Sequence, residues 1–223
     1  ANGAMFAASA PVVSPGQAMN RLGLQPSAAL MTAFLVRHAI PVKSPQLAGF
    51  WEQSTRRAQA LAWVATQLPG LSPELAHSYG LFCHVGLPVL MQSVRGYAGT
   101  MVEARARKDR SFVETENANH RTDHAVVGAL TARAWKLAPT VMAAIRLHHS
   151  LESLGSGDTE PEVHTLVAAG LLADDLLARL DGLPDDAEWE QFGTVACEWL
   201  AVSADDLAHW DALLGEPDAL MAA

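Results

Sequence analysis

Four histidines and one aspartate have residue types and a spacing that suit a common site. The chain has 223 residues, nine of them histidine. His84 is followed by His124, then by the adjacent pair His148 and His149, and Asp174 lies on the next predicted helix. Imidazole and carboxylate groups together bind divalent ions, which activate water for hydrolysis. We therefore predict that these five residues line one ligand pocket. The alternative for each histidine is a place on the surface or a hydrogen-bonded place in the core.

The elements that must position these residues are helices. The sequence contains 40 Ala and 29 Leu but only 2 Ile and 2 Tyr. Ala and Leu favour helices, whereas Ile, Val, Tyr and Thr favour strands. The composition therefore predicts an all-α protein and excludes a sandwich, a barrel or a doubly wound sheet.

Serine–proline pairs and capping boxes indicate where these helices begin. Ser14, Ser44 and Ser72 each place a capping hydroxyl before a proline at the first helical position. Residues 111–114 fit a capping box, and residues 203–206 resemble one with Asp in place of Glu. Together with the breakers, these signals predict helices over residues 14–23, 27–38, 45–68, 72–84, 87–93, 97–107, 111–119, 122–136, 139–149, 162–180, 185–201 and 203–214.

The stretch LGSGDTEP, residues 154–161, is the most loop-like part of the chain. We interpret it as a loop inside one domain and not as a boundary between two. The prediction is a single helical domain over residues 1–223, on which the acidic helices of residues 181–223 pack.

The charge is distributed unevenly along the chain. Residues 1–150 contain 14 Lys or Arg and 7 Asp or Glu, a balance of +7, whereas residues 151–223 contain one Arg and 17 Asp or Glu, a balance of −16. An acidic surface repels phosphate groups, so we expect no nucleic acid as a partner. The acidic part is either a solvated surface or a docking surface for a basic protein.

The two cysteines, Cys83 and Cys197, are too few for a disulfide framework, which favours a reducing cytoplasm. No apolar stretch is long enough to cross a membrane, and the apolar first residues lack the basic region of a signal peptide. Cys83 and His84 are neighbours that diverge on a helix, so a thiol–imidazole nucleophile is not expected.

Several segments, in order along the chain, resemble one family. The segment 80–86, GLFCHVG, resembles the "GLLHDIG" element of the HD superfamily. More specifically, the chain is similar to the HDOD domain, the HD-related output domain of bacterial signalling proteins. The further segments that carry this resemblance are Ala1–Phe6, Gln17–Gly23, Phe50–Ser54 with Ala58, His124–Gly128, Ala134–Pro139, Ile145–His149 and Leu207 in the last helix. The family's first helices precede the segment that Ala1–Phe6 resembles, so we expect this chain to lack them.

The departures from the HD pattern bear on catalysis. The resemblance implies that a first histidine, a His-Asp doublet and a later aspartate hold the metal in catalytic relatives. Here Gln53 stands at the first position and the doublet reads His84-Val85, while Asp174 matches the late aspartate. Valine has no metal-ligating atom. We therefore expect a degenerate metal site, no cofactor and no catalytic residue; if a divalent ion is bound, its ligands are His84, His124, His148, His149 and Asp174.

The resemblance implies a function in bacterial signal transduction. The leading hypothesis is a non-catalytic regulatory module that acts by contact with a signalling protein or by sensing a small ligand. The alternative is a metal-dependent phosphohydrolase acting on a nucleotide or phosphoester. The residues after His149 read Ser-Leu-Glu-Ser and lack the "HHE..dG.GYP" run of cyclic-di-GMP phosphodiesterases, so that activity is not expected.

Overall fold

The computed structural model describes residues 14–184 and 186–214, whose regular secondary structure is entirely helical. The all-α prediction is confirmed. The elements are α1 (Pro15–Leu22), α2 (Leu24–Ala39), α3 (Phe50–Gln67), α4 (Pro73–Phe82), α5 (Gly86–Ser93), α6 (Tyr97–Ala106), α7 (Phe112–His120), α8 (His124–Ala134), α9 (Pro139–Leu147), α10 (Pro161–Leu180), α11 (Ala187–Leu200) and α12 (Ala204–Leu214), with short 3₁₀ turns at Pro45–Leu47 and Leu151–Ser153. The segment Ala1–Phe6 lies outside the described residues.

The helix starts follow the capping signals in the sequence. The hydroxyls of Ser14 and Ser72 accept from the backbone N–H groups of Gln17 and Leu75, and a proline follows each serine. The capping box at Ser111 and Glu114 is complete. Ser203 and Asp206 bond each other's backbone N–H, as the sequence predicts.

One predicted start is wrong. The serine–proline pair at Ser44 begins only the 3₁₀ turn Pro45–Leu47, and α3 starts at Phe50. The break lies at Gly49, whose φ of 75° is a left-handed conformation that glycine adopts without steric cost. The prediction failed because it used the start signal of Ser44 and Pro45 but ignored Gly49, which interrupts the helix.

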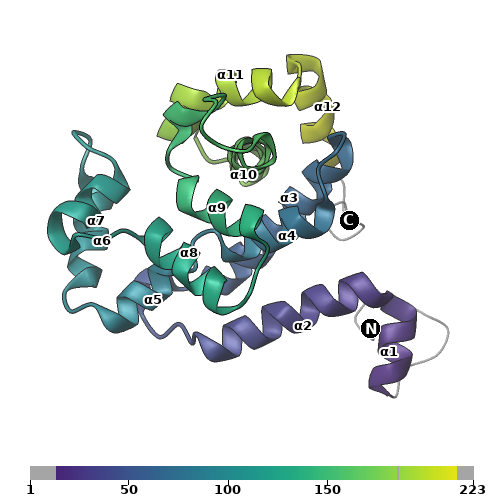
Figure 1. Ribbon diagram of the computed structural model, residues 1–223, viewed down its shortest axis with the longest axis horizontal. Coiled ribbons are helices and arrows are strands. Elements are labelled where there is room, and N and C mark those ends of the chain that lie inside the picture. Colours follow the sequence, from purple (N-terminus) through teal and green to yellow (C-terminus); the bar gives the residue numbers. More distant parts are fainter. Residues whose placement is uncertain (1–13, 185, 215–223) are drawn as a thin grey trace.

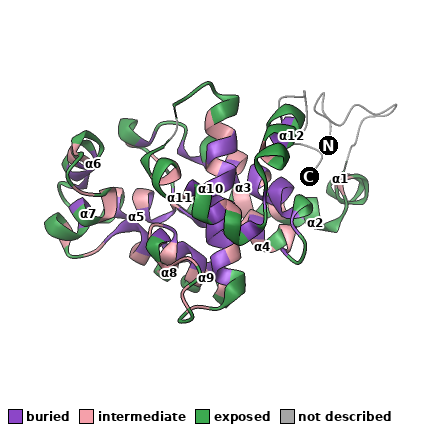
Figure 2. Ribbon diagram, turned by 90° about the horizontal axis from the view of Figure 1, so that it is seen from above, coloured by how far each residue is buried: buried purple, intermediate pink, exposed green. Residues whose placement is uncertain are grey.

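The long helix α10 lies at the centre of the bundle (Figure 1). Helices α3, α9, α11 and α12 all contact it, and α4 packs along α3. Twelve of its twenty residues are buried, including Leu166, Leu172 and Leu176. Figure 2 shows the buried residues concentrated along α10, α3 and α4, while much of α1, α2 and α12 is exposed. The core therefore surrounds α10 and supports the turns that carry the histidines.

Two glycines set how closely the helices of the site approach. A Cβ at Gly80 of α4 would lie 2.7 Å from the Cα of Ala58 in α3, and a Cβ at Gly86 would lie 2.0 Å from the carbonyl oxygen of His124. Real side chains do not tolerate such contacts, so only glycine permits this packing. Gly86 holds the start of α5 against the start of α8 and thereby brings His84 beside His124.

The LGSGDTEP stretch forms turns between the 3₁₀ turn at Leu151–Ser153 and α10. The acidic helices α11 and α12 both pack on α10. Within the described ranges, no helix combines the length and the apolar character that crossing a bilayer requires.

Candidate functional site

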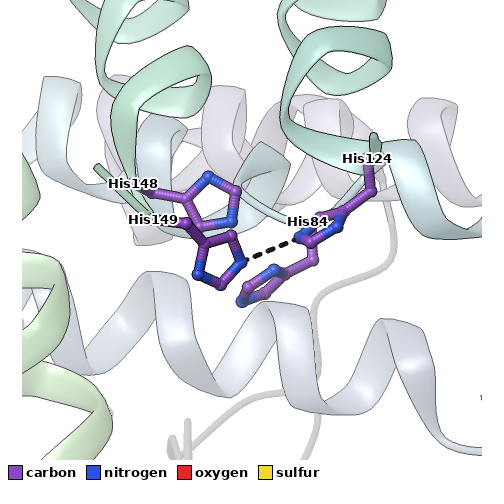
Figure 3. A group of neighbouring side chains, drawn as sticks. All are labelled: His84, His124, His148 and His149. Atoms are coloured by element: carbon purple, nitrogen blue, oxygen red, sulfur yellow. Dashed lines mark hydrogen bonds between the residues drawn. The ribbon is translucent and has the colours of Figure 1, made fainter. Parts of the chain in front are cut away.

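The four predicted histidines lie together, on turns and helix starts that converge (Figure 3). One ring nitrogen from each lies within 4.8 Å of the others. His84 is in the turn after α4, His124 is the first residue of α8, and His148 and His149 follow α9. The Nε2 atoms of His124 and His149 are 3.1 Å apart, and the rings of His148 and His149 have centroids 4.0 Å apart. These four histidines are four of the five residues that the sequence analysis assigned to one pocket.

Three of these imidazoles are fixed by acceptors at their Nδ1 atoms. His124 Nδ1 lies 2.7 Å from a carboxylate oxygen of Glu116, and His149 Nδ1 lies 2.6 Å from one of Glu188. His148 Nδ1 lies 2.7 Å from the carbonyl oxygen of Ile145. Carbonyl and carboxylate oxygens only accept, so each Nδ1 carries the hydrogen.

His84 belongs to the same cluster but has a different partner. The guanidinium of Arg57, on α3, donates to His84 Nε2 and to the carboxylate of Asp174 on α10. The Arg57 side chain is only 10% exposed, whereas that of Asp174 is 41% exposed. Asp174 therefore lies at the edge of the histidine cluster, joined to it through Arg57.

Gln53, the predicted counterpart of the first metal-binding histidine, is exposed. The α3 residue that contacts His84 is Arg57, one helical turn further on. The sequence reasoning missed it because arginine is not a metal ligand. A signal was present, however, since Arg57 falls on the stripe of Ser54, Ala58 and Leu61 that α3 turns toward the core.

The residues at the HD-type position do not fit a metal ion. Such an ion would be held by His84, the doublet partner and Asp174, but the doublet partner is Val85, whose side chain is fully buried. The two remaining ligands already receive hydrogen bonds from Arg57, which is always cationic. The guanidinium would repel a metal ion bound between His84 and Asp174. The positive charge at this position is therefore supplied by Arg57.

The protonation states follow from burial. Burial lowers the pKa of His84 and His148 well below the ordinary value, and the charges of neighbouring groups add to this effect. Burial also lowers the pKa of His124, against the opposing effect of Glu116. The imidazoles of His84, His124 and His148 are therefore neutral at pH 7. Loss of hydration raises the pKa of Asp174 to about 6, so its carboxyl is still ionised at pH 7 and pairs with Arg57.

Two glutamates complete the site, and the sequence reasoning missed both. Glu116 in α7 is fully buried; it accepts from the hydroxyl of Tyr97 and from the backbone N–H and Nδ1–H of His124. Glu188 in the first turn of α11 holds His149. Both lie in acidic, polar stretches that read as solvent-facing, and only the tertiary packing places them beside imidazoles.

Cys83 is not a nucleophile candidate, as expected. The thiol is buried, and burial raises its pKa to about 11. It is therefore protonated at neutral pH, and only the thiolate reacts readily.

Comparisons with known proteins agree with this fold. The family model for the HDOD domain matches residues 1–151. A candidate phosphohydrolase from Shewanella amazonensis SB2B has 26% sequence identity and a TM-score of 0.69, with 93% of this chain and 75% of that chain covered. An HDOD domain protein of unknown function from Geobacter sulfurreducens has 21% identity and a TM-score of 0.68, covering 99% of this chain and 77% of that one.

A candidate signal transduction protein from Marinobacter aquaeolei VT8 has 21% identity and a TM-score of 0.74; the match covers 99% of this chain and about half, 49%, of that longer chain. Comparison with curated proteins gives no match. The fold is that of the HD and HDOD helical proteins. The chain belongs to the HDOD domain family.

Proposed function

We propose that this chain is a non-catalytic regulatory module of a signalling pathway, in which the HD-type position is closed by Arg57. The observation that carries the proposal is the guanidinium between His84 and Asp174, beside the buried Val85. Arginine supplies a fixed positive charge but no Lewis-acid site to which water can bind. Membership of the HDOD family supports a signalling role over catalysis.

We further propose that the module acts through its acidic helices. Glu190 and Glu198 of α11 and Asp205 and Asp211 of α12 are exposed. Trp199, the neighbour of Glu198 in the sequence of α11, is 36% exposed. An acidic surface that also carries an exposed aromatic side chain suits a protein partner whose surface is basic with an apolar part. Such a surface attracts its partner most strongly at low ionic strength.

The alternative function, a metal-dependent phosphohydrolase, is favoured by one observation. The imidazoles of His84, His124, His148 and His149 converge, and imidazole ligands suit several catalytic metals. The missing carboxylate at Val85 and the charge of Arg57 argue against it.

One assay separates the two functions. The protein is loaded in turn with Mn²⁺, Fe²⁺, Ni²⁺ and Zn²⁺ and tested on a phosphomonoester, a phosphodiester and a cyclic dinucleotide. We expect no turnover above that of His84→Ala. Turnover that His84→Ala abolishes and the exposed-site control His209→Ala retains would overturn the proposal.

A variant sharpens the same test. Val85→Asp restores the carboxylate of the doublet but leaves Arg57 in place and supplies no first histidine. We therefore expect it to remain inactive in any fraction that folds. Measurable phosphoesterase turnover in this single variant, absent from wild type, would show that Val85 alone prevents catalysis.

A further inference from the structure

Helix α2 carries large apolar side chains that the bundle leaves in solvent (Figure 2). Five of them are between 49% and 73% exposed: Leu24, Leu30, Met31, Phe34 and Leu35. Of the sixteen residues of α2, only Ser27 and Val36 are buried. A helix that is apolar on all sides is normally buried on all sides. One face of α2 therefore lacks, within the described residues, the contact that its composition is typical of.

Four of these side chains form two adjacent rows along the outer face of α2. Residues four apart lie on the same side of a helix, so Leu30 and Phe34 form one row with His38. Met31 and Leu35 form the second row. The ring of Phe34 stacks on that of His38, with centroids 6.3 Å apart. Such rows are the ridges that pack into the grooves of another helix. We call this face, with Leu24, the α2 stripe.

The exposed area of the α2 stripe is sufficient for a stable interface with an equal partner. Its five large apolar side chains together expose on the order of 600 Å², which is near the upper limit of the largest apolar patch on a typical monomer. Two copies of the stripe would bury about 1,200 Å² from these side chains alone. That value reaches the lower limit of specific interfaces, about 1,200–2,000 Å².

The bundle holds the α2 stripe in a fixed position. The indole N–H of Trp51 donates to the carbonyl oxygen of Ile40 at 3.1 Å, and the amide of Gln92 donates to that of Pro41, also at 3.1 Å. On the inner face of α2, Val36 is fully buried, and the helix contacts α4. These contacts attach the end of α2 to its neighbours, so little ordering of α2 is needed when a partner binds.

We propose that the α2 stripe is a homodimer interface, in which the stripes of two copies of this chain pack against each other. A charged partner has little to bind here, because Arg37 is the only Lys, Arg, Asp or Glu of α2 and it already pairs with Glu52 at 2.9 Å. An uncharged apolar stripe is complementary to itself, as the two-fold symmetry of a homodimer requires.

The position of α2 in the fold is compatible with such a dimer. Helices α11 and α12 lie on the other side of the bundle from α2 (Figure 1). Pairing through α2 therefore keeps the acidic helices of the two copies apart, where they do not repel each other. The proposal does not depend on the regulatory function proposed above.

The test is sedimentation equilibrium of the whole chain between about 1 and 200 μM, the range in which a modest apolar interface associates. We expect the mean mass to rise with concentration toward twice that of one chain. Phe34→Glu places a charge in the stripe, where the dimer would bury it without a partner, and should weaken dimerisation at least about 100-fold. Val102→Glu, at a 58% exposed residue of α6, is the matched control and should dimerise as wild type does. The circular dichroism of each variant confirms that it folds.

Hydrogen exchange of residues 24–39 provides a second readout. It should slow as the concentration of wild type rises and should not change in Phe34→Glu. A monomer at every concentration would overturn the proposal, and so would a dimer that Phe34→Glu and Val102→Glu affect equally. Monomeric protein that binds vesicles of phosphatidylcholine and phosphatidylglycerol, and loses this binding in Phe34→Glu, would assign the stripe to a lipid surface and would also overturn it.

Discussion

The two halves of the buried cluster differ in how their charges are satisfied. On the side of α3 and α10, Arg57 donates to His84 and Asp174, so a cation of the protein itself occupies the position. On the side of α8 and α9, the Nδ1 atoms of His124, His148 and His149 each face an oxygen acceptor, and the Nε2 atoms of His124 and His149 lie 3.1 Å apart. Neighbouring imidazoles in one fold thus have opposite roles. His84 accepts from a cation of the protein, whereas the other three donate to oxygen atoms.

The largest effect is expected from a substitution that disturbs the close approach of α5 to α8, on which both halves of the cluster depend. Gly86→Ala introduces a Cβ that would lie 2.0 Å from the carbonyl oxygen of His124, and backbone atoms cannot move aside as a side chain can. We expect a loss of about 3 kcal/mol in the free energy of unfolding, measured by urea denaturation. Gly99→Ala in α6, where a Cβ meets nothing within 4 Å, is the matched control and should not destabilise the protein. Equal effects would contradict the close approach.

The next largest loss of stability is expected where Arg57 lies between His84 and Asp174. Arg57→Met leaves Asp174 and His84 without their shared donor. We expect a loss of about 2 kcal/mol, less than for a fully buried pair because the Asp174 side chain is 41% exposed. Its neighbour Arg56 pairs with Asp181 at the surface, and Arg56→Met should cost under about 1 kcal/mol. A smaller cost for Arg57→Met than for Arg56→Met would show that the internal pair contributes nothing.

The pH dependence of the metal-free protein tests the neutral state of the imidazoles. Burial lowers the pKa of His84, His124 and His148 below the ordinary 6.5. Between 6.5 and those lower values the unfolded chain binds more protons than the folded one, so stability is complete above about pH 6.5 and falls as the pH falls below it. Each imidazole contributes up to about 1.4 kcal/mol per pH unit in that window.

Urea denaturation at pH 7.5, 6.5 and 5.5, with chelator present, measures this loss. Stability that is constant, or that rises, between pH 7.5 and 5.5 would show that the folded cluster already carries protons.

The smallest effect concerns the acidic surface. Trp199→Ala removes the exposed aromatic ring of α11, together with its hydrogen bond to Thr165. We expect a stability loss of about 1 kcal/mol. Binding to a basic partner protein, once found, should weaken and should depend on salt. Unchanged binding to that partner would show that the ring takes no part in the acidic surface.

The sequence predicted those parts of the molecule that local chemistry determines. The all-α fold followed from the residue types, and the capping serines located most helix starts. The convergence of His84, His124, His148 and His149 was also expected from the family pattern. Their partners were not, because Glu116, Glu188 and Arg57 come from α7, α11 and α3, and only the packing of these helices brings them to the imidazoles.

The start of α3 and the position of Gln53 show the same limit. A serine–proline pair predicts a helix start, but Gly49 delays it to Phe50. A motif assigns Gln53 to the first metal-binding position, but a helix presents residues four apart on one face, and the residue that reaches His84 is Arg57. A resemblance in sequence therefore identifies the site, while the side chains present decide its chemistry.

The most direct measurement is the anomalous X-ray scattering of a crystal of this protein soaked in Zn²⁺. We expect Arg57 to remain between His84 and Asp174, with no peak at that position. A peak between His84 and Asp174 with Arg57 displaced would contradict the closure of the HD-type position by Arg57.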